Sequence, residues 1–255
     1  QDISFSSQRL SLNLTRHYNN HLHDTGPEKA VGPFGHGWTH SLNLHLESAS
    51  EPGEQIYVDD RGTRIVFRLN GNSADYLSPP GSLGLELIRL PQGGFHLRQI
   101  DGLTAEFNQQ GRLLTLTRPG PEADSRLDFQ YDRRDRLAQV IGAGGRALTF
   151  SYHSNESLIR SVTDHVGRSW HYRYNQQQEL IEDPLGRIRR YGYDEWRGLV
   201  STAKGETEPR TIRAMSKVFR YIRESDKGEP VAKLTNQYTT DRRVYRQVDT
   251  LGNVT

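Results

Sequence analysis

Three histidines near the N-terminus are the first residues whose types and spacing could do chemistry. His17, His21 and His23 stand close together, with Asp24 beside them. Neutral imidazoles and a carboxylate at such spacing can hold a divalent metal ion. The segment reads as a strand that runs into a polar loop, and no second cluster supplies further ligands. We therefore expect exposed loop histidines and no metal site.

Other candidate groups also favour structural roles. His36 and His40 flank Trp38, where turn hydrogen bonds explain them better than proton transfer does. The glycine-rich stretch 142–145 is not followed by a lysine or by a predicted helix, which argues against a phosphate site. No carboxylate pair stands out, and no catalytic serine motif is present. We expect no catalytic residue, no cofactor and no enzymatic activity.

The composition indicates a β-rich protein. The chain has 24 Gly, 11 Pro and 12 Tyr but one Met, and 33% of its residues are hydrophobic. This balance suits strands and turns better than helices. The absence of cysteine excludes disulfides, thiolate zinc sites and cysteine nucleophiles. The net charge of +2 does not indicate a nucleic-acid partner, and no apolar run is long enough to span a bilayer.

An internal repeat appears when the sequence is aligned on an aromatic residue. The aligned aromatics, at spacings of 24, 21, 22 and 19 residues, are Phe107, Tyr131, Tyr152, Tyr174 and Tyr193. The leucines that follow six residues later are Leu113, Leu137, Leu158, Leu180 and Leu199. Apolar residues stand two and four positions before most of the aromatics, an alternation that is typical of strands with one buried face.

Turn residues separate these strands. Asp132 and Asp194 directly follow their tyrosines, and Gly-Arg pairs include Gly167-Arg168 and Gly186-Arg187. Asp side chains bond back to the backbone in turns, and glycine tolerates positive φ. Each repeat is therefore expected to form two strands and two turns. A lone hairpin is marginal in water, so the repeats are expected to join into an extended antiparallel sheet.

The repeat resembles that of the Rhs or YD-repeat proteins, which are named for this tyrosine–aspartate unit. Tyr131-Asp132 and Tyr193-Asp194 carry the pair intact. A second stretch is similar to the GPFG-x-GW sequence at the start of the repeat region in bacterial Rhs proteins. We call it the GPFG segment, and its matching residues are Gly32, Pro33, Phe34, Gly35, Gly37 and Trp38. The two resemblances cover residues 30–206 and the final stretch.

The resemblance implies an all-β, repeat-built antiparallel sheet of YD hairpins that curves into part of a hollow shell, or cocoon. The function it implies is structural. The chain would be a shell segment of a polymorphic toxin, similar to a type VI secretion effector, that encloses a C-terminal toxin domain for bacterial competition. Implied partners are the remaining shell segments, the enclosed toxin, and a secretion spike protein or chaperone. The implied location is the bacterial cytoplasm before export, then secretion or delivery to target cells.

Four regions follow from these patterns. They are an N-terminal Rhs-like segment with irregular strands (1–100), the YD-repeat sheet (101–206), a basic helical insertion (207–232) and a resumed repeat that stops inside a unit (233–255). Ile212, Met215, Phe219 and Ile222 form one stripe at helical spacing, which predicts a short amphipathic helix near 211–224. The basic charge of this region suits either a solvated face or a docking site for an acidic partner.

Two further motifs leave alternatives open. Asp183-Pro184-Leu185-Gly186 matches the short core of a self-cleavage segment in Rhs toxins, but it lacks the wider context and is expected to be an ordinary repeat turn. Stacked aromatic rings can also bind sugars, although the strand face that carries them must be buried. The main alternative function is therefore a cell-surface adhesion or carbohydrate-binding module. Candidates for a lining surface are His171, Arg173, Arg190 and Trp196.

Overall fold

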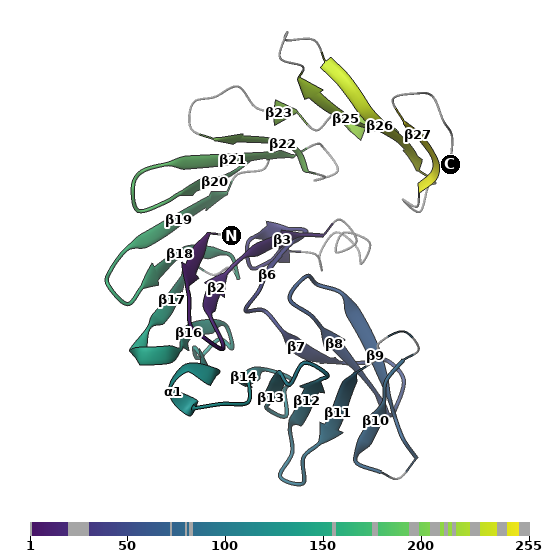
Figure 1. The fold of residues 1–255 in the computed structure, drawn as a ribbon, viewed down its shortest axis with the longest axis vertical. Coiled ribbons are helices and arrows are strands. Elements are labelled where there is room, and N and C mark those ends of the chain that lie inside the picture. The colour runs from purple at the N-terminus through teal and green to yellow at the C-terminus, as the bar shows by residue number, and fades with distance from the viewer. Residues whose placement is uncertain are drawn as a thin grey trace. The chain divides into compact units, whose positions relative to one another are not determined.

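Figure 1 shows a computed structural model of the 255-residue chain, which consists almost entirely of β-strands. The chain forms two compact units, Gln1–Ser169 and Trp170–Thr255. The structure describes residues 2–19, 31–71, 73–79, 81, 84–154, 157–174, 178–193, 199–204, 210–211, 214–215, 218–224, 230–238 and 244–249.

The N-terminal part of the first unit contains three antiparallel strand pairs. They are β1 (Ile3–Phe5) with β2 (Leu12–Leu14), β3 (Arg16–Tyr18) with β6 (Trp38–His40), and β4 (Val31–Gly32) with β5 (Gly35–His36). Ile3, Leu12 and Leu14 are buried, although an isolated pair of three-residue strands cannot cover its own apolar side chains. The first hairpin must therefore pack against the rest of its unit.

The remainder of the first unit is a meander in which each strand pairs antiparallel with the next. Its strands are β7 (His45–Ser48), β8 (Glu54–Val58), β9 (Arg64–Leu69), β10 (Asp75–Leu77), β11 (Leu85–Arg89), β12 (Phe95–Gln99), β13 (Thr104–Phe107), β14 (Leu113–Thr117), β15 (Arg126–Tyr131), β16 (Leu137–Ile141), β17 (Ala147–Tyr152) and β18 (Ile159–Asp164). A one-turn helix, α1 (Glu122–Ser125), precedes β15, and a 3₁₀ turn, η2 (Ala143–Gly145), precedes β17. The prediction of an all-β antiparallel sheet is confirmed.

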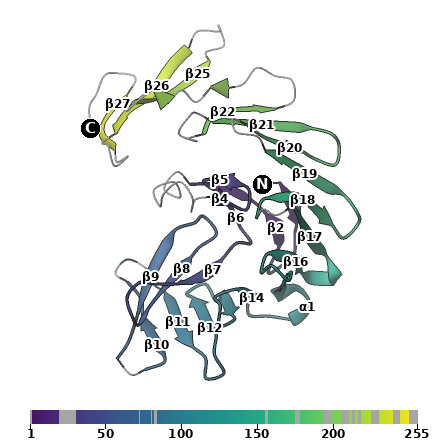
Figure 2. The ribbon, with the colours of Figure 1, turned by 180° about the vertical axis from the view of Figure 1, so that it is seen from behind.

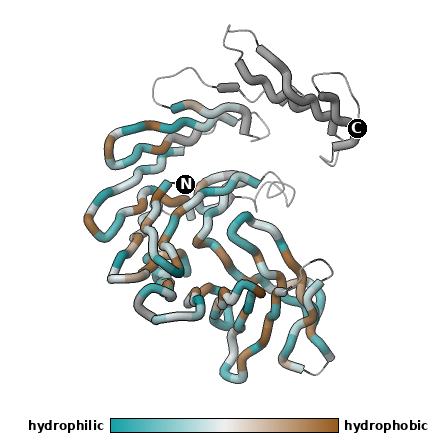
Figure 3. The backbone as a smooth tube through the Cα atoms, in the orientation of Figure 1, coloured by the Kyte–Doolittle hydropathy of each residue, from teal (hydrophilic) through white to brown (hydrophobic). Residues whose placement is uncertain are grey.

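Side chains alternate along these strands between a buried face and a solvent-facing one. In β17, Leu148 and Phe150 are buried, while Thr149 between them is exposed. Figure 3 shows the same change between hydrophobic and hydrophilic positions along the described strands. Because successive side chains of a strand point to opposite faces, the apolar side chains of each strand gather on one face of its sheet.

The strands from β7 to β14 curl, so that β7 contacts the turn between β13 and β14. Leu46 in β7 donates its backbone N–H to the carbonyl oxygen of Gly111, at 2.8 Å, and His45 forms a β-bridge with Arg112. Figure 2 shows β7, β8 and β9 beside β10, β11 and β12 in this region. The side chains buried inside are Leu46, Tyr57, Phe67, Leu87, Leu97, Phe107 and Leu113. This closure gives the region a core of its own, which the repeat pattern did not indicate.

The second unit continues the hairpin pattern. Its described strands are β19 (Ser169–Tyr174), β20 (Gln178–Glu182), β21 (Ile188–Tyr193), β22 (Leu199–Lys204), β23 (Arg210–Thr211), β24 (Ala214–Met215), β25 (Val218–Glu224), β26 (Pro230–Tyr238) and β27 (Val244–Asp249). β24 to β27 form a four-stranded sheet in which neighbours along the chain pair antiparallel.

The helix predicted near 211–224 is wrong, because the described residues of this stretch are strands. β25 pairs with β26 along its whole length, from Val218 opposite Gln237 to Glu224 opposite Pro230. Val218, Phe219, Tyr221 and Ile222 are β-branched or aromatic residues, which favour strands. The stripe at helical spacing contained only four side chains, so the strand preference of these residues and their pairing with the next strand outweighed it.

Candidate functional site

The repeat turns share one hydrogen-bond pattern, which Asp132 illustrates. Its backbone N–H donates to the carbonyl of Arg136 at 2.8 Å, and its Oδ1 accepts the backbone N–H groups of Arg134 and Arg136 at 2.9 and 3.0 Å. The residue three positions on has positive φ, as in a hairpin turn with a G1 bulge. The same pattern starts at Asp59, Asn108, Asp164 and Asp183.

An arginine completes three of these turns. Arg136, Arg168 and Arg187 donate from Nε to Oδ2 of the aspartate four residues earlier, at 2.9, 2.7 and 2.6 Å. Burial alone would raise the pKa of Asp132 and of Asp164, but the arginine and the backbone N–H groups hold each pKa below its ordinary value. These carboxylates are thus stabilised as anions, which suits a turn and not a general acid.

Asp183 lies in the motif that resembles a self-cleavage core. Its Oδ1 accepts the backbone N–H groups of Leu185 and Arg187, and Gly186 has a φ of 73°. Burial opposes ionisation here too, yet the hydrogen bonds from Arg187 and Leu185 lower the pKa of Asp183. Asp164 accepts from the residues at the same positions of its own turn, Val166 and Arg168, and that turn contains Gly167 with a φ of 87°. The geometry at Asp183 is therefore that of a repeat turn.

The repeat tyrosines tie one repeat to the previous one. Tyr131 Oη donates to the carbonyl oxygen of Leu113 at 3.0 Å, and Tyr152 Oη donates to that of Leu137 at 2.8 Å. Burial raises the pKa of both phenols. The guanidinium of Arg136 also lies 4.2 Å from the ring centre of Tyr152. A turn arginine and a tyrosine hydroxyl therefore both join adjacent repeats.

The aromatics also mark β-bulges. The strand register shifts immediately before Phe107, Tyr131, Tyr152 and Tyr193. A bulge sharpens the local twist of a strand and changes the direction of its side chain. Tyr174 ends β19 without a register shift, and Asp194 lies outside the described residues. Sequence reasoning missed Tyr238, where the register shifts in the same way.

The GPFG segment lies against the repeat sheet. Phe34 is fully buried, and the carbonyl of Pro33 accepts the backbone N–H of Ile159 in β18 at 2.8 Å. A Cβ on Gly32 would overlap the carbonyl oxygen of Trp38, so only glycine fits there. Gly35 and Gly37 have φ values of 100° and 72°. The segment therefore joins the N-terminal strands to the repeats.

A buried ion pair lies beside this segment. Arg16 Nε is 2.6 Å from Asp2 Oδ2, and these side chains are 3% and 5% exposed. The Arg16 guanidinium lies 4.6 Å from the Trp38 ring centre and 5.5 Å from that of Phe34. Sequence reasoning missed this pair, because an acid and a base that are 14 residues apart give no local signal.

His40, two residues after Trp38, is a buried titratable group with 2% of its surface exposed. Desolvation, with smaller contributions from His17 and His45, lowers the pKa of His40 to about 3. Its Nδ1 accepts the backbone N–H of Leu42 at 3.3 Å, and its ring lies against Phe34 and Phe150. His40 is therefore a neutral structural residue.

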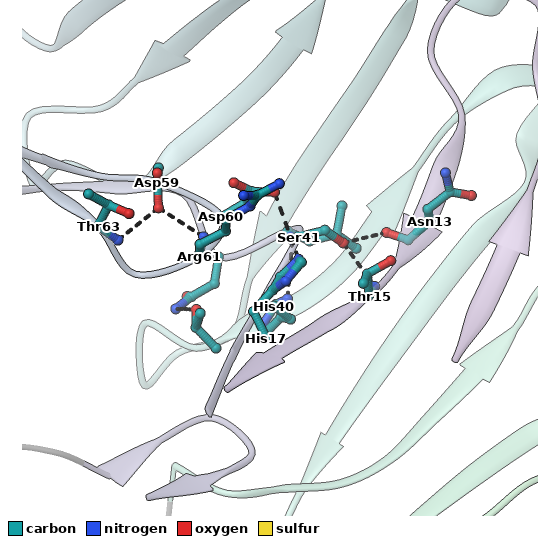
Figure 4. A network of polar contacts seen from close by, with 12 residues as sticks. Asn13, Thr15, His17, His40, Ser41, Asp59, Asp60, Arg61 and Thr63 are labelled. Atoms are coloured by element: carbon teal, nitrogen blue, oxygen red, sulfur yellow. Dashed lines mark hydrogen bonds and ion pairs between the residues drawn. The ribbon is translucent and has the colours of Figure 1, made fainter. Parts of the chain in front are cut away.

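Figure 4 shows the polar residues around His40. Ser41 Oγ donates to the carbonyl of Asn13 at 2.7 Å and accepts the backbone N–H of Thr15, so its hydroxyl has structural partners. His17 Nε2 is 3.9 Å from Asp60 Oδ2. His21, His23 and Asp24 lie outside the described residues. Among the residues described, no group of three potential metal ligands occurs.

The proposed lining residues are only partly described. His171 and Arg173 are exposed, and Arg173 Nη2 lies 3.5 Å from Glu182 Oε2. Arg190 is half-buried, and Trp196 is outside the described residues. In the part of the chain that is described, no helix has the length and apolar character needed to cross a membrane.

Comparison with known proteins assigns no function. A family model described as a domain of unknown function (DUF6531) matches residues 1–67. No curated protein matches the chain. Among solved structures, the chain is similar to a chain in the crystal structure of TcdB2-TccC3-TEV, with 12% sequence identity and a TM-score of 0.24. The match covers 79% of this chain but 15% of the other, so this chain spans a small part of that protein's length.

Proposed function

We propose that the chain is a structural segment of an Rhs or YD-repeat shell that encloses a C-terminal toxin domain. The observation that carries the proposal is the tie between repeats, in which Tyr131 and Tyr152 each donate to a leucine carbonyl of the preceding repeat. Such a tie can recur at every repeat, so a longer chain can extend the same wall without new chemistry.

The solvent-facing side of the repeat strands suits a container wall. From β16 to the first residue of β19 it carries an uncharged set of cross-strand hydrogen bonds. The pairs are Gln139 with Thr149 at 3.0 Å, Ser151 with Ser161 at 2.7 Å, and Thr163 with Ser169 at 2.8 Å. Hydroxyl and amide groups that already have partners bind a passing polypeptide only weakly. Such a wall would keep other molecules away from its cargo and would release the cargo without any catalytic reaction.

The shell proposal includes partners and delivery. The remaining shell segments and the toxin domain would be partners, with a spike protein or chaperone during export by a type VI secretion system. The protein would reside in the bacterial cytoplasm before export and act after delivery to a competitor. Any toxic activity would belong to the enclosed domain.

The carbohydrate-binding alternative requires aromatic rings that are exposed to solvent. Among the described residues, the large apolar side chains exposed to solvent are Val66, Leu77, Ile100, Leu114, Val166 and Leu185. None of them is aromatic, whereas sugar-binding surfaces use aromatic rings.

The test is protease protection of the native full-length gene product. The product is purified gently, treated with a protease, and the surviving fragments are identified by denaturing mass spectrometry. We expect a dissimilar domain to co-purify with the repeat chain and to resist digestion until mild denaturant opens the sheet. A chain that travels alone, or a companion domain that is digested at once, would overturn the proposal. Binding of the lone chain to a glycan array would then favour the adhesion alternative.

A further inference from the structure

The turn between β9 and β10 contains the one Asn-Gly pair of the sequence, Asn70-Gly71. Both residues are exposed to solvent. The backbone nitrogen that follows an asparagine can attack the carbon of its side-chain amide and close a five-membered ring. A glycine in the following position favours this reaction, because it has no Cβ to obstruct the approach. The pair therefore has the composition and the exposure of a site of covalent change.

Backbone hydrogen bonds hold this turn. The N–H of Asn70 donates to the carbonyl of Asp75 at 3.0 Å, and the carbonyl of Asn70 accepts the N–H of Ser73 at 3.0 Å. Gly71 has a φ of 57°, and a Cβ placed on it would have no neighbouring atom within 4 Å. Its N–H donates to the carbonyl of Leu69 at 3.1 Å. The glycine therefore lies beside open solvent, and the bond on its N–H comes from within the same turn.

The side chain of Asn70 is not held by the fold. Among the residues described, its amide makes no hydrogen bond, so it can rotate toward the nitrogen of Gly71. Asn108, at the turn after β13, gives the contrast. Its Oδ1 accepts the backbone N–H groups of Gln110 and Arg112 at 3.0 and 2.9 Å, and the residue that follows it carries a side chain. The fold thus distinguishes the two asparagines.

An aspartate–glycine pair, Asp101-Gly102, follows β12 and is held differently. Oδ1 of Asp101 accepts the backbone N–H of Leu103 at 3.1 Å, and Oδ2 accepts Nη2 of Arg118 at 2.7 Å. These bonds lower the pKa of Asp101, so its side chain stays an anion. A carboxylate anion lacks the leaving group that an amide or a protonated acid provides. Asp101 should therefore not close the ring, although a glycine follows it.

We propose that Asn70 is a site of spontaneous deamidation in the folded protein, with water as the second reactant. The nitrogen of Gly71 forms a bond to Cγ of Asn70, the Cγ–Nδ2 bond breaks, and the proton of the Gly71 N–H leaves with the amide nitrogen as ammonia. Water then opens the five-membered ring at one of its two carbonyl carbons. The product is an aspartyl residue or an isoaspartyl residue, whose backbone runs through Cγ. The proposal does not depend on the shell function.

The isoaspartyl product changes the turn. The carbonyl group that accepts the N–H of Ser73 leaves the backbone and becomes a carboxylate, and one extra carbon enters the backbone. β10 is the element that depends on this turn, because it has three residues and pairs with β9 at two positions, Leu69 with Tyr76 and Arg68 with Leu77. The reaction therefore loosens β10 from β9 as the protein ages.

The test is incubation of the 255-residue chain at mildly acidic and mildly alkaline pH, followed by digestion and tandem mass spectrometry. We expect position 70 to gain the mass of an amide-to-acid exchange and its peptide to separate into two chromatographic forms. The conversion should be faster at alkaline pH, because the attacking nitrogen must lose its proton. The peptides of Asn108 and Asp101 should each remain a single, unchanged form. An Asn70 that stays intact in the folded chain, whether or not it converts in urea, would overturn the proposal, and so would equal conversion of Asn108.

Asn70→Gln separates the chemistry from the structure. Glutamine keeps the amide but would close a larger ring, which forms more slowly, so position 70 should show no mass gain over the same incubation. Hydrogen exchange of the backbone N–H groups of β10 should be equal in the fresh parent chain and the fresh variant, and faster in the aged parent chain. Equal exchange after ageing would refute the loosening of β10. A mass gain at position 70 of the variant would refute the ring mechanism.

Discussion

His40 is held as a neutral imidazole. Leu42 donates a backbone N–H to its Nδ1, and the rings of Phe34 and Phe150 surround it. A protonated His40 could not accept the bond from Leu42 and would place a charge in a core. His40, one of the two histidines that flank Trp38, is thus a packing residue of the core.

This arrangement makes the fold sensitive to acid. The pKa of His40 is about 3 when folded and about 6.5 in an unfolded chain, so the unfolded state binds more protons between these values. The free energy of unfolding should therefore fall as pH drops below about 6.5, by about 1.4 kcal/mol per pH unit at most. Urea unfolding between pH 7.5 and 5.5 would measure the slope above the pH range in which the carboxylates of the unfolded chain take up protons.

His40→Gln isolates this effect. Gln has no titration in the window, so the variant should be less stable at neutral pH but should show a flatter dependence on pH. His171→Gln is the matched control, because His171 is exposed. An unchanged slope in His40→Gln would show that other groups cause the acid sensitivity.

The hydroxyls of Tyr131 and Tyr152 each join two repeats by one hydrogen bond. Tyr152→Phe should lower the free energy of unfolding by about 1–3 kcal/mol, because the carbonyl of Leu137 loses its donor in a half-buried place. Tyr76→Phe keeps the edge contact with Phe95 and should cost less than about 0.5 kcal/mol. Equal unfolding curves for the two variants would show that the tie does not contribute to stability.

At the scale of elements, the hairpin turn is the unit that repeats. Each turn combines a side chain that accepts two backbone N–H groups with a residue of positive φ. Both features satisfy the hydrogen bonds and the conformation of the turn backbone. Asp135 shows the tolerance of the pattern, since it takes the glycine position with a φ of 62°. Asp135 Oδ2 lies 2.6 Å from Arg112 Nη2, an ion pair that links the turn after β13 to the turn after β15.

Two glycines at the same turn position allow the cost of positive φ to be measured apart from the cost of a steric overlap. Gly111 and Gly167 have φ values of 79° and 87°. Gly167→Ala should cost about 1–2 kcal/mol, because a Cβ there meets no neighbour and only the left-handed conformation is disfavoured. Gly111→Ala should cost clearly more, because its Cβ would overlap the carbonyl oxygen of Leu46. Thermal unfolding of both variants tests the order, and equal costs would mean that β7 does not close on this turn.

At the scale of the whole molecule, the GPFG segment and the Arg16–Asp2 pair bind the N-terminal strands to one another and to the repeat sheet. Pro33 reaches β18 by a backbone bond, while Asp2, Arg16 and Trp38 come from three separate parts of the N-terminal region. A buried pair of this kind is costly to break from one side only.

A double-mutant cycle measures the pair. Asp2→Asn or Arg16→Met alone should destabilise the fold by about 3–5 kcal/mol, because each leaves a buried partner uncompensated. The double variant should cost less than the sum of the two, with a coupling energy of at least about 1 kcal/mol. Additive losses in urea unfolding would show that the two side chains do not stabilise each other.

The sequence by itself determined the features that depend on near neighbours. Strand alternation, the Asp and Gly turn positions and the repeat spacing were all predictable, because a hairpin's faces and turn are encoded within about 20 residues. Tyr131 and Tyr152 were predicted as repeat markers, and the structure shows the hydrogen bonds that they make. The predicted helix near 211–224 failed although β25 and β26 are also neighbours along the chain, because four side chains at helical spacing do not outweigh the strand preference of β-branched and aromatic residues.

Only the tertiary structure decided the rest. The bond between Leu46 and Gly111 and the bond between Ile159 and Pro33 each join residues that are distant in sequence, and the burial of the Arg16–Asp2 pair depends on Phe34 and Trp38. Local composition does not mark such partners. The free energy of a buried charge depends on the groups that pack around it, and these groups come from other parts of the chain. Local chemistry therefore specified the hairpins, and the packing of distant segments specified which charges became buried.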